Sequence, residues 1–67
     1  MLEIFINGVP RRLETPMTVA LLLERDGLTG KRLAVEKNGE IVPKSRHADT
    51  PLAPGDRLEI VVAVGGG

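Results

Sequence analysis

The 67-residue sequence has no cysteine, tryptophan or tyrosine, and it contains one phenylalanine and one histidine. Without cysteine, neither a disulfide nor a thiolate metal cluster can stabilise the fold, and a Cys–His catalytic pair is excluded. A Ser–His–Asp set would depend on the single histidine, His47, which stands in a polar stretch beside Arg46 and Asp49. We therefore expect His47 to be solvated in a loop, and we expect a protein that is not itself an enzyme.

The sequence also lacks an excess of charge of either sign, because nine basic side chains balance nine acidic ones. Nucleic-acid-binding proteins normally carry a basic surplus, and the shortage of aromatic residues removes the usual stacking platforms for single strands. No apolar run approaches the roughly 20 residues that span a bilayer, and the N-terminus has no signal-peptide pattern. The carboxylates lack metal-ligand spacing. These absences predict a soluble cytoplasmic protein with no metal, no nucleic-acid partner and no membrane partner.

Aliphatic residues are abundant, and their spacing predicts a first hairpin. Apolar side chains alternate along residues 2–6 with the period of two that is typical of a half-buried strand. Asn7-Gly8 follows, and this dipeptide favours the positive φ angles of a tight type I′ hairpin turn. Residues 9–13 form the return strand, and Pro10 indicates that it lies at an edge of the sheet because proline cannot donate to a ladder.

A short helix is predicted after Pro16. Thr18 is suited to the N-cap, and Val19, Leu22 and Leu23 then form an apolar stripe at i, i+3, i+4 spacing. Gly27 is suited to the left-handed residue that ends a helix. About two turns of helix do not persist alone in water, so this helix must pack against a sheet.

Three further strands are predicted in the second half. Residues 33–36 and 41–42 flank Asn38-Gly39, a second hairpin signal, and residues 44–50 read as polar and irregular. Residues 57–64 form a long final strand. A helix between the hairpin and the later strands requires a crossover, so some strands should pair in parallel. We predict an α+β β-grasp fold, in which the first and last strands lie side by side in a mixed sheet and one main helix packs on one face.

The most distinctive feature is the glycine tail, which consists of Gly65, Gly66 and Gly67. We expect a single β-grasp domain over residues 1–64 and a flexible tail over residues 65–67, because glycine has the greatest backbone freedom of any residue. Three extended residues reach roughly 10 Å, so all three glycines could enter a partner's active site. A carboxylate on Gly67 is ionised at neutral pH and can attack the α-phosphorus of ATP. A persulfide or a thiol can attack the resulting mixed anhydride. The alternative interpretation is ordinary fraying of terminal residues.

The whole chain resembles the ubiquitin-like β-grasp family of thiamin-biosynthesis sulfur carriers, the ThiS family. The resemblance rests on five segments taken together, which are residues 4–8 (IFING), 18–22 (TVALL), 33–43 (LAVEKNGEIVP), 54–60 (PGDRLEI) and 62–67 (VAVGGG). The diglycine end that this family requires corresponds to Gly66 and Gly67, and Gly65 lengthens the run by one residue.

The resemblance implies a set of partners. An E1-like (ThiF-like) adenylating enzyme would use ATP to activate Gly67, and the carrier would bind no permanent cofactor. A persulfide sulfur donor would convert the adenylate to a thiocarboxylate. Thiazole synthase (ThiG-like) would then take the sulfur into the thiazole ring of thiamin.

The strand pattern also predicts a docking face for these partners. If the even-numbered apolar residues of the first and last strands face the helix, then Phe5, Val61 and Ala63 lie on the open face of the sheet and form an apolar patch. Arg57 and Glu59 share that face as a polar rim. Incidental exposure of apolar residues in a small domain is the alternative.

Three other functions stay open from the sequence. A related sulfur carrier for molybdopterin synthesis has a similar fold and a diglycine end, although such carriers tend to have longer insertions. A ubiquitin-like protein modifier would join Gly67 to a lysine. A plain β-grasp binding module would use no chemistry at the glycine tail.

Overall fold

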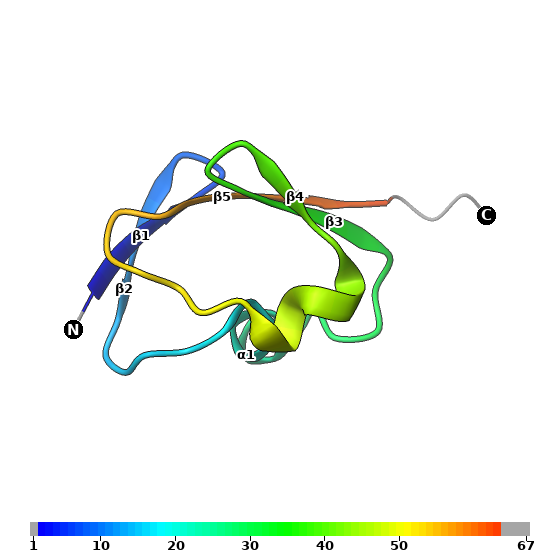
Figure 1. Cartoon of the computed structure of the whole chain (residues 1–67), viewed down its shortest axis with the longest axis horizontal. Coiled ribbons are helices and arrows are strands. Elements are labelled where there is room, and N and C mark those ends of the chain that lie inside the picture. The colour runs from blue at the N-terminus through cyan, green and yellow to red at the C-terminus, as the bar shows by residue number, and fades with distance from the viewer. Residues whose placement is uncertain (1, 64–67) are drawn as a thin grey trace.

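The computed structural model describes residues 2–63 as a five-stranded sheet with helices on one side (Figure 1). The elements in chain order are β1 (Leu2–Ile6), β2 (Val9–Leu13), α1 (Val19–Arg25), β3 (Leu33–Lys37), β4 (Glu40–Val42), the 3₁₀ helix η1 (Lys44–Asp49) and β5 (Arg57–Val62). The strand order is β2-β1-β5-β3-β4, with β1 and β5 parallel and the other pairs antiparallel. The predicted α+β β-grasp fold is therefore confirmed, including the first and last strands side by side and β2 at an edge.

Both Asn-Gly dipeptides form the predicted hairpin turns. Asn7 and Gly8 have φ angles of 52° and 83°, and Asn38 and Gly39 have φ angles of 53° and 86°. Two consecutive positive φ angles define a type I′ turn, whose twist matches that of the strands it joins. These turns set the register of β1 against β2 and of β3 against β4.

Helix α1 begins and ends at the residues expected. The Thr18 hydroxyl accepts a hydrogen bond from the backbone N–H of Leu21 at 3.3 Å. At the other end, Leu28 N–H donates to the Leu23 carbonyl at 2.8 Å, and Gly27 N–H donates to the Glu24 carbonyl at 3.1 Å. With Gly27 at a φ of 72°, this is a Schellman C-cap. Capping at both ends restricts the helix to seven residues and holds its apolar stripe against the sheet.

The core lies between the sheet and α1, as the alternation of side chains between the two faces of each strand requires. Ile4, Val35 and Leu58 are fully buried on the sheet side, and Val19 and Leu22 are fully buried on the helix side. Leu13, Met17, Leu23, Leu52 and Ile60 complete the buried cluster. The core is almost wholly aliphatic, so burial of small hydrocarbon side chains supplies most of the stability.

An ion pair joins the edge strand β2 to the end of α1. The Arg11 guanidinium donates from two nitrogens to the two carboxylate oxygens of Asp26, one of them at 3.1 Å. The hydrogen bond to Asp26 raises the pKa of Arg11, an effect that burial opposes and the attraction of the two charges reinforces. The bridge closes one side of the core.

Two expectations for the second half of the chain are wrong. The stretch after Pro43 is not irregular but forms η1, and His47 is buried rather than solvated. Its Nε2 lies 3.1 Å from the Val42 carbonyl, and because a carbonyl can only accept, Nε2 carries the hydrogen. The histidine thus satisfies a carbonyl at the end of the short strand β4, and the 3₁₀ helix that carries it contacts α1. A local polar pattern does not reveal such a contact.

The final strand is shorter than expected within the described part of the chain. Strand β5 ends at Val62, and the remainder of the predicted 57–64 range includes Val64, which lies outside the described residues. Leu58 and Ile60 face the core as predicted, whereas Val62, expected on the same face, is 38% exposed.

Candidate functional site

The glycine tail that carries the predicted chemistry lies outside the described residues, so the roles expected for Gly65, Gly66 and Gly67 stay predictions. The structure does describe the strand that precedes the tail, up to Ala63. The backbone N–H of Ala63 donates to the Arg32 carbonyl at 2.8 Å, so pairing with the β3 side of the sheet continues one residue past β5. The candidate site therefore consists of β5, the open face of the sheet and the groove beside β3.

Strand β5 is held in the centre of the sheet on both sides. Five residues of β3 pair with it in antiparallel register, and Phe5 and Ile6 of β1 pair with Arg57 and Leu58 in parallel register. Beyond Ile6 the chain turns away into the first hairpin. Backbone pairing with β1 therefore covers only the first part of β5.

The side chain of Asn7 continues the pairing where β1 stops. Its Oδ1 accepts from the Ile60 N–H at 2.8 Å, and its Nδ2 donates to the Ile60 carbonyl at 3.1 Å. The amide thus bonds to Ile60 as a neighbouring strand would. One residue both makes the positive-φ turn and braces the middle of the central strand.

Asn38 braces the start of β5 from the opposite hairpin. Its Oδ1 accepts from the Arg57 N–H at 2.9 Å, and its Nδ2 donates to the Asp56 carboxylate at 3.0 Å. The other oxygen of the buried Asp56 accepts from the Ala53 N–H at 2.8 Å, and the Lys37 ammonium lies 3.7 Å away. The buried charge is therefore fully compensated, as a carboxylate in this position must be.

The open face of the sheet carries the predicted docking residues. Because Leu58 and Ile60 are buried against the helix, the alternation of the strand directs Arg57, Glu59 and Val61 to the opposite side, where all three are exposed. Val61 is 63% exposed. Ala63 is exposed as well, and Phe5 is half-buried. Whether these residues contact a partner stays a prediction.

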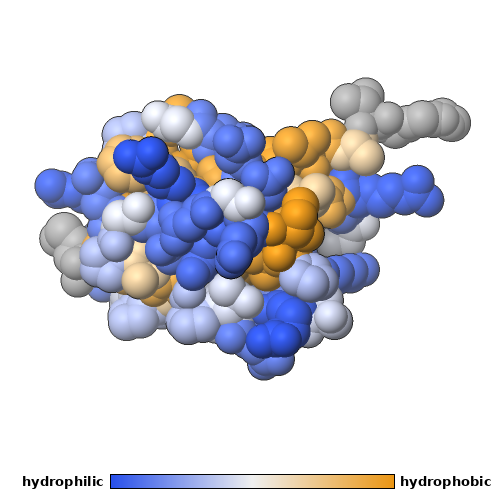
Figure 2. Space-filling model, turned by 45° about the horizontal axis from the view of Figure 1, so that its top comes forward, coloured by the Kyte–Doolittle hydropathy of each residue, from blue (hydrophilic) through white to orange (hydrophobic). Residues whose placement is uncertain are grey.

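Of the three apolar residues expected to cluster on this face, Val61 and Ala63 lie near each other along the chain, but Phe5 lies apart from them. Phe5 lies opposite Arg57, which is four residues, or about 13 Å, along β5 from Val61, so Phe5 is not its neighbour. The direct neighbour of Val61 comes from the other side, since Ala34 of β3 lies opposite it, and Ile41 of β4 lies on the same face, opposite Glu36 and diagonal to Ala34. Figure 2 shows hydrophobic surface gathered beside the end of β5, with hydrophilic residues over the centre of the view.

The sequence analysis did not place Ala34 and Ile41 on the apolar part of the open face. Ile41 belongs to a hairpin whose Asn38-Gly39 turn predicts the pairing of Glu36 with Ile41, so a local signal existed. Ala34 meets Val61 through a pairing of segments 27 residues apart, and no local pattern gives that register. We call Ala34, Ile41, Val61 and Ala63 the open-face patch.

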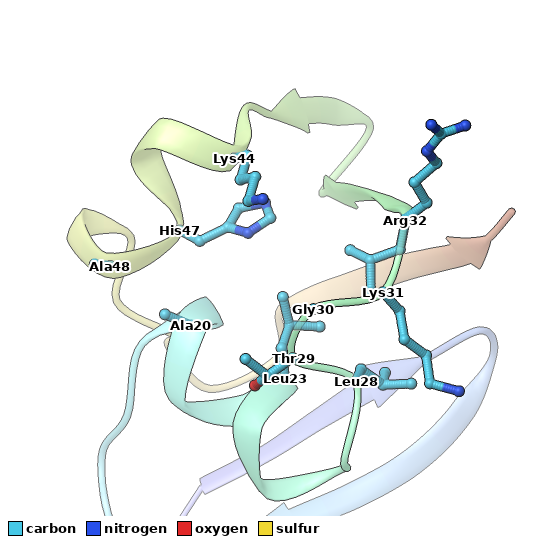
Figure 3. Close-up of a pocket in the computed structure, with 11 residues that line it drawn as sticks. Ala20, Leu23, Leu28, Thr29, Gly30, Lys31, Arg32, Lys44, His47 and Ala48 are labelled. Atoms are coloured by element: carbon cyan, nitrogen blue, oxygen red, sulfur yellow. The ribbon is translucent and has the colours of Figure 1, made fainter.

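A groove of about 420 Å³ lies on the other side of the sheet, between the end of α1, the loop before β3, and η1 (Figure 3). Leu23, Leu28 and Leu33 contribute apolar surface to it, and Lys44 and His47 line it from η1. The sequence predicted no site here, because its residues come from three separate segments.

The described residues offer little chemistry of their own. Within residues 2–63, no group of three His, Asp or Glu side chains is placed to hold a metal ion. In the same range, no helix has the length and apolar character needed to cross a membrane. The candidate site is therefore strand β5, held by side-chain hydrogen bonds, with the open face of the sheet on one side and the groove on the other. The glycine-rich sequence follows this strand in the chain.

Comparison with known proteins places the chain in a family. The model of the ThiS family matches residues 4–67. The chain belongs to the ThiS family. The crystal structure of the thiamine biosynthesis protein ThiS from Geobacter metallireducens superposes on this ThiS-family chain with a TM-score of 0.83 at 26% identity, covering 98% of this chain and 100% of that one. The fold is thus the ubiquitin-like β-grasp of ThiS proteins.

Relatives of this ThiS-family chain include both small and large proteins. It is 46% identical over 66 residues to a thiazole synthase of Paramagnetospirillum magneticum, covering 98% of this chain and 20% of that protein. It is 35% identical to the uncharacterised protein ycf40 of Pyropia yezoensis, covering 98% of this chain and 93% of that one. The chain therefore spans about a fifth of the length of the thiazole synthase and nearly all of the small relative.

Proposed function

We propose that this protein is a sulfur carrier for thiamin biosynthesis, with Gly67 as the residue that carries the sulfur. The observation that supports this most strongly is the extent of the family match, which runs from residue 4 through Gly67 and so includes the whole glycine tail. The proposal requires Gly67 to carry a free carboxylate, with Gly65 and Gly66 as the narrow segment that leads it into a partner's active site. The folded domain then serves as the surface that partner enzymes bind while they act on the Gly67 carboxylate.

The proposed reaction has two stages. In the first, a carboxylate oxygen of Gly67 attacks the α-phosphorus of ATP in the active site of an E1-like adenylating enzyme, and pyrophosphate leaves. In the second, the terminal sulfur of a persulfide donor attacks the carbonyl carbon, and AMP leaves. A further thiol then attacks the S–S bond of this acyl disulfide and releases the thiocarboxylate. Glycine suits both attacks because it has no side chain to hinder the carbonyl.

The open face is the proposed docking surface for the adenylating enzyme. The open-face patch offers exposed aliphatic surface beside the end of β5. On the same face of β5, Glu59 stands two residues before Val61, and Arg57 stands at the start of the strand. Apolar contact with a polar rim is the common composition of a protein interface. Phe5, half-buried at the far end of the face, would contribute only if the partner covers the whole sheet.

The proposed sulfur acceptor is a thiazole synthase. Two relatives bear that name, from Paramagnetospirillum magneticum and Magnetococcus marinus, and in each the similar region makes up a fifth of the protein. A region resembling this carrier within a longer thiazole synthase supports a functional link between the two. This chain would supply the sulfur, and the synthase would supply the catalytic groups.

Intact mass spectrometry tests the proposal. The protein is incubated with ATP, an adenylating enzyme and a persulfide donor, and we expect a mass gain equal to the replacement of one oxygen by sulfur. Deletion of Gly67 should abolish the gain and leave thermal unfolding unchanged, because the residue follows the folded domain. A deletion variant that still gains sulfur would overturn the proposed position.

The same experiment separates the alternatives. Conjugates of higher mass, linked to lysines, would identify a protein modifier, and no mass change would identify a plain binding module. Transfer of sulfur from the purified thiocarboxylate to a molybdopterin synthase subunit, but not to a thiazole synthase, would move the carrier to the other pathway.

A further inference from the structure

The groove on the helix side of the sheet combines apolar surface with positive charge. Leu23, Leu28 and Leu33 supply the apolar surface, and Lys31, Arg32 and Lys44 stand around it. In Figure 3, Lys44 and His47 lie together on the η1 side, and Lys31 and Arg32 extend in different directions from the loop opposite. A volume of about 420 Å³ is within the usual range of binding pockets.

The positive charge of this groove is unbalanced locally. Among residues 2–63, no aspartate or glutamate lines it, although the chain as a whole has as many acidic as basic residues. The ion pairs found within residues 2–63 are Arg11–Asp26 and Lys37–Asp56, so none of the three groove cations forms a direct ion pair with a carboxylate of that range. A complementary occupant is acidic and has an apolar group that can enter between the leucines.

The groove is continuous with the strand that leads to the glycine tail. Arg32, at its edge, accepts the hydrogen bond from Ala63, and Leu33 pairs with Val62. Any partner that takes up the residues after Ala63 therefore comes close to this groove. Leu33 and Val35 lie on the helix side of β3, so the groove faces away from the open-face patch.

We propose that the groove docks an acidic segment with an apolar anchor on the thiazole synthase, so that the two partners of the carrier bind opposite sides of the sheet. This inference rests on the proposed function. The thiazole synthase relatives support this choice of partner, because in them a region similar to this chain is tethered to the rest of the synthase.

Charge reversal at the groove provides the test. The double variant Lys44→Glu, Arg32→Glu changes two exposed side chains and should leave the fold intact, which a two-dimensional NMR spectrum checks. Calorimetry should show that its affinity for a thiazole synthase is reduced about tenfold or more. Added salt should also lower the affinity of the wild-type protein, because it screens the charges of the groove. Sulfur loading of Gly67 by the adenylating enzyme should be unchanged.

Arg46→Glu is the matched control. Arg46 is an exposed cation of the same 3₁₀ helix, but it borders a different hollow with Glu40 and Ile41. Reversing the charge at this position should leave the affinity for the thiazole synthase unchanged. Equal weakening by Arg46→Glu would overturn the groove as a specific site.

Two further outcomes would also contradict the inference. Wild-type affinity in the double variant would show that the synthase does not use the groove. The wild-type protein could also form a dimer that the double variant does not form, while the variant keeps its affinity for the synthase. That result would assign the groove to a second copy of the chain. These outcomes are distinct from failure of the proposed function, in which wild-type Gly67 takes no sulfur at all.

Discussion

The two faces of the sheet are built from the same strands but have opposite properties. On the helix side, Ile4, Val35 and Leu58 are completely buried, whereas on the open side Val61 and Ile41 are each more than 60% exposed. The residues alternate along single strands, so a shift of one position separates the core from the surface. In a chain this small, stability depends on one face, and the other is free to bind partners.

The largest effect on stability is expected from shortening a core leucine. Leu22→Ala removes a fully buried side chain of α1 and should cost about 2–5 kcal/mol in unfolding free energy. A domain of this length has a total stability of roughly 3–10 kcal/mol, so this loss is a large fraction of the whole. Leu21→Ala, at the adjacent and half-exposed position, is the control, and urea unfolding measures both. Equal losses at the two positions would contradict the difference between the buried and the exposed side of α1.

A smaller loss is expected from Asp56, whose carboxylate organises the start of β5. Asp56→Ala leaves the Asn38 side-chain amide and the Ala53 N–H without their acceptor and should cost about 1–3 kcal/mol. Asp49→Ala, at an exposed carboxylate of η1, serves as the comparison. If urea midpoints of the two variants coincide, the buried network is not a source of stability.

The helix that covers the core should lose about 1 kcal/mol when its cap is removed. Thr18→Ala deletes the hydroxyl that accepts from Leu21 N–H. Thr29→Ala changes an exposed loop threonine and should leave stability unchanged. Thermal unfolding followed by circular dichroism distinguishes them, and an unaltered Thr18→Ala curve would mean that packing alone positions α1.

The smallest effect on folding, and the sharpest on binding, is expected on the open face. Val61→Glu and Val9→Glu each introduce a charge at a side chain that is 63% exposed, so both should change stability by less than about 0.5 kcal/mol. Val61 lies in the open-face patch, whereas Val9 lies at the edge strand opposite Ile6. Only Val61→Glu should weaken binding to the adenylating enzyme in calorimetry. Equal weakening by Val9→Glu would remove the open face as the docking surface.

The parts of the fold that the sequence predicted are those governed by local chemistry. Asn7-Gly8 and Asn38-Gly39 make their turns through backbone preferences of two residues, and Thr18 and Gly27 cap α1 through contacts within a few positions. Period-two alternation likewise placed the core face of β1 and β5 correctly, because each strand carries its own pattern.

The parts that the sequence did not predict depend on contacts between distant segments. His47 is buried in a 3₁₀ helix that contacts α1, and its ring bonds to a carbonyl of β4; its polar neighbours in sequence give no sign of this. The separation of Phe5 from Val61 follows from the register of β1 against β5. The groove forms only when α1, the loop before β3 and η1 come together.

Tandem mass spectrometry of the C-terminal peptide, after the loading reaction and again after addition of a thiazole synthase, tests the role of Gly67 most directly. We expect sulfur on the Gly67 carbonyl after loading, and its loss to the acceptor when the synthase is added. Sulfur found on any other residue, or a Gly67 carboxylate that keeps both oxygens under every donor system, would contradict it.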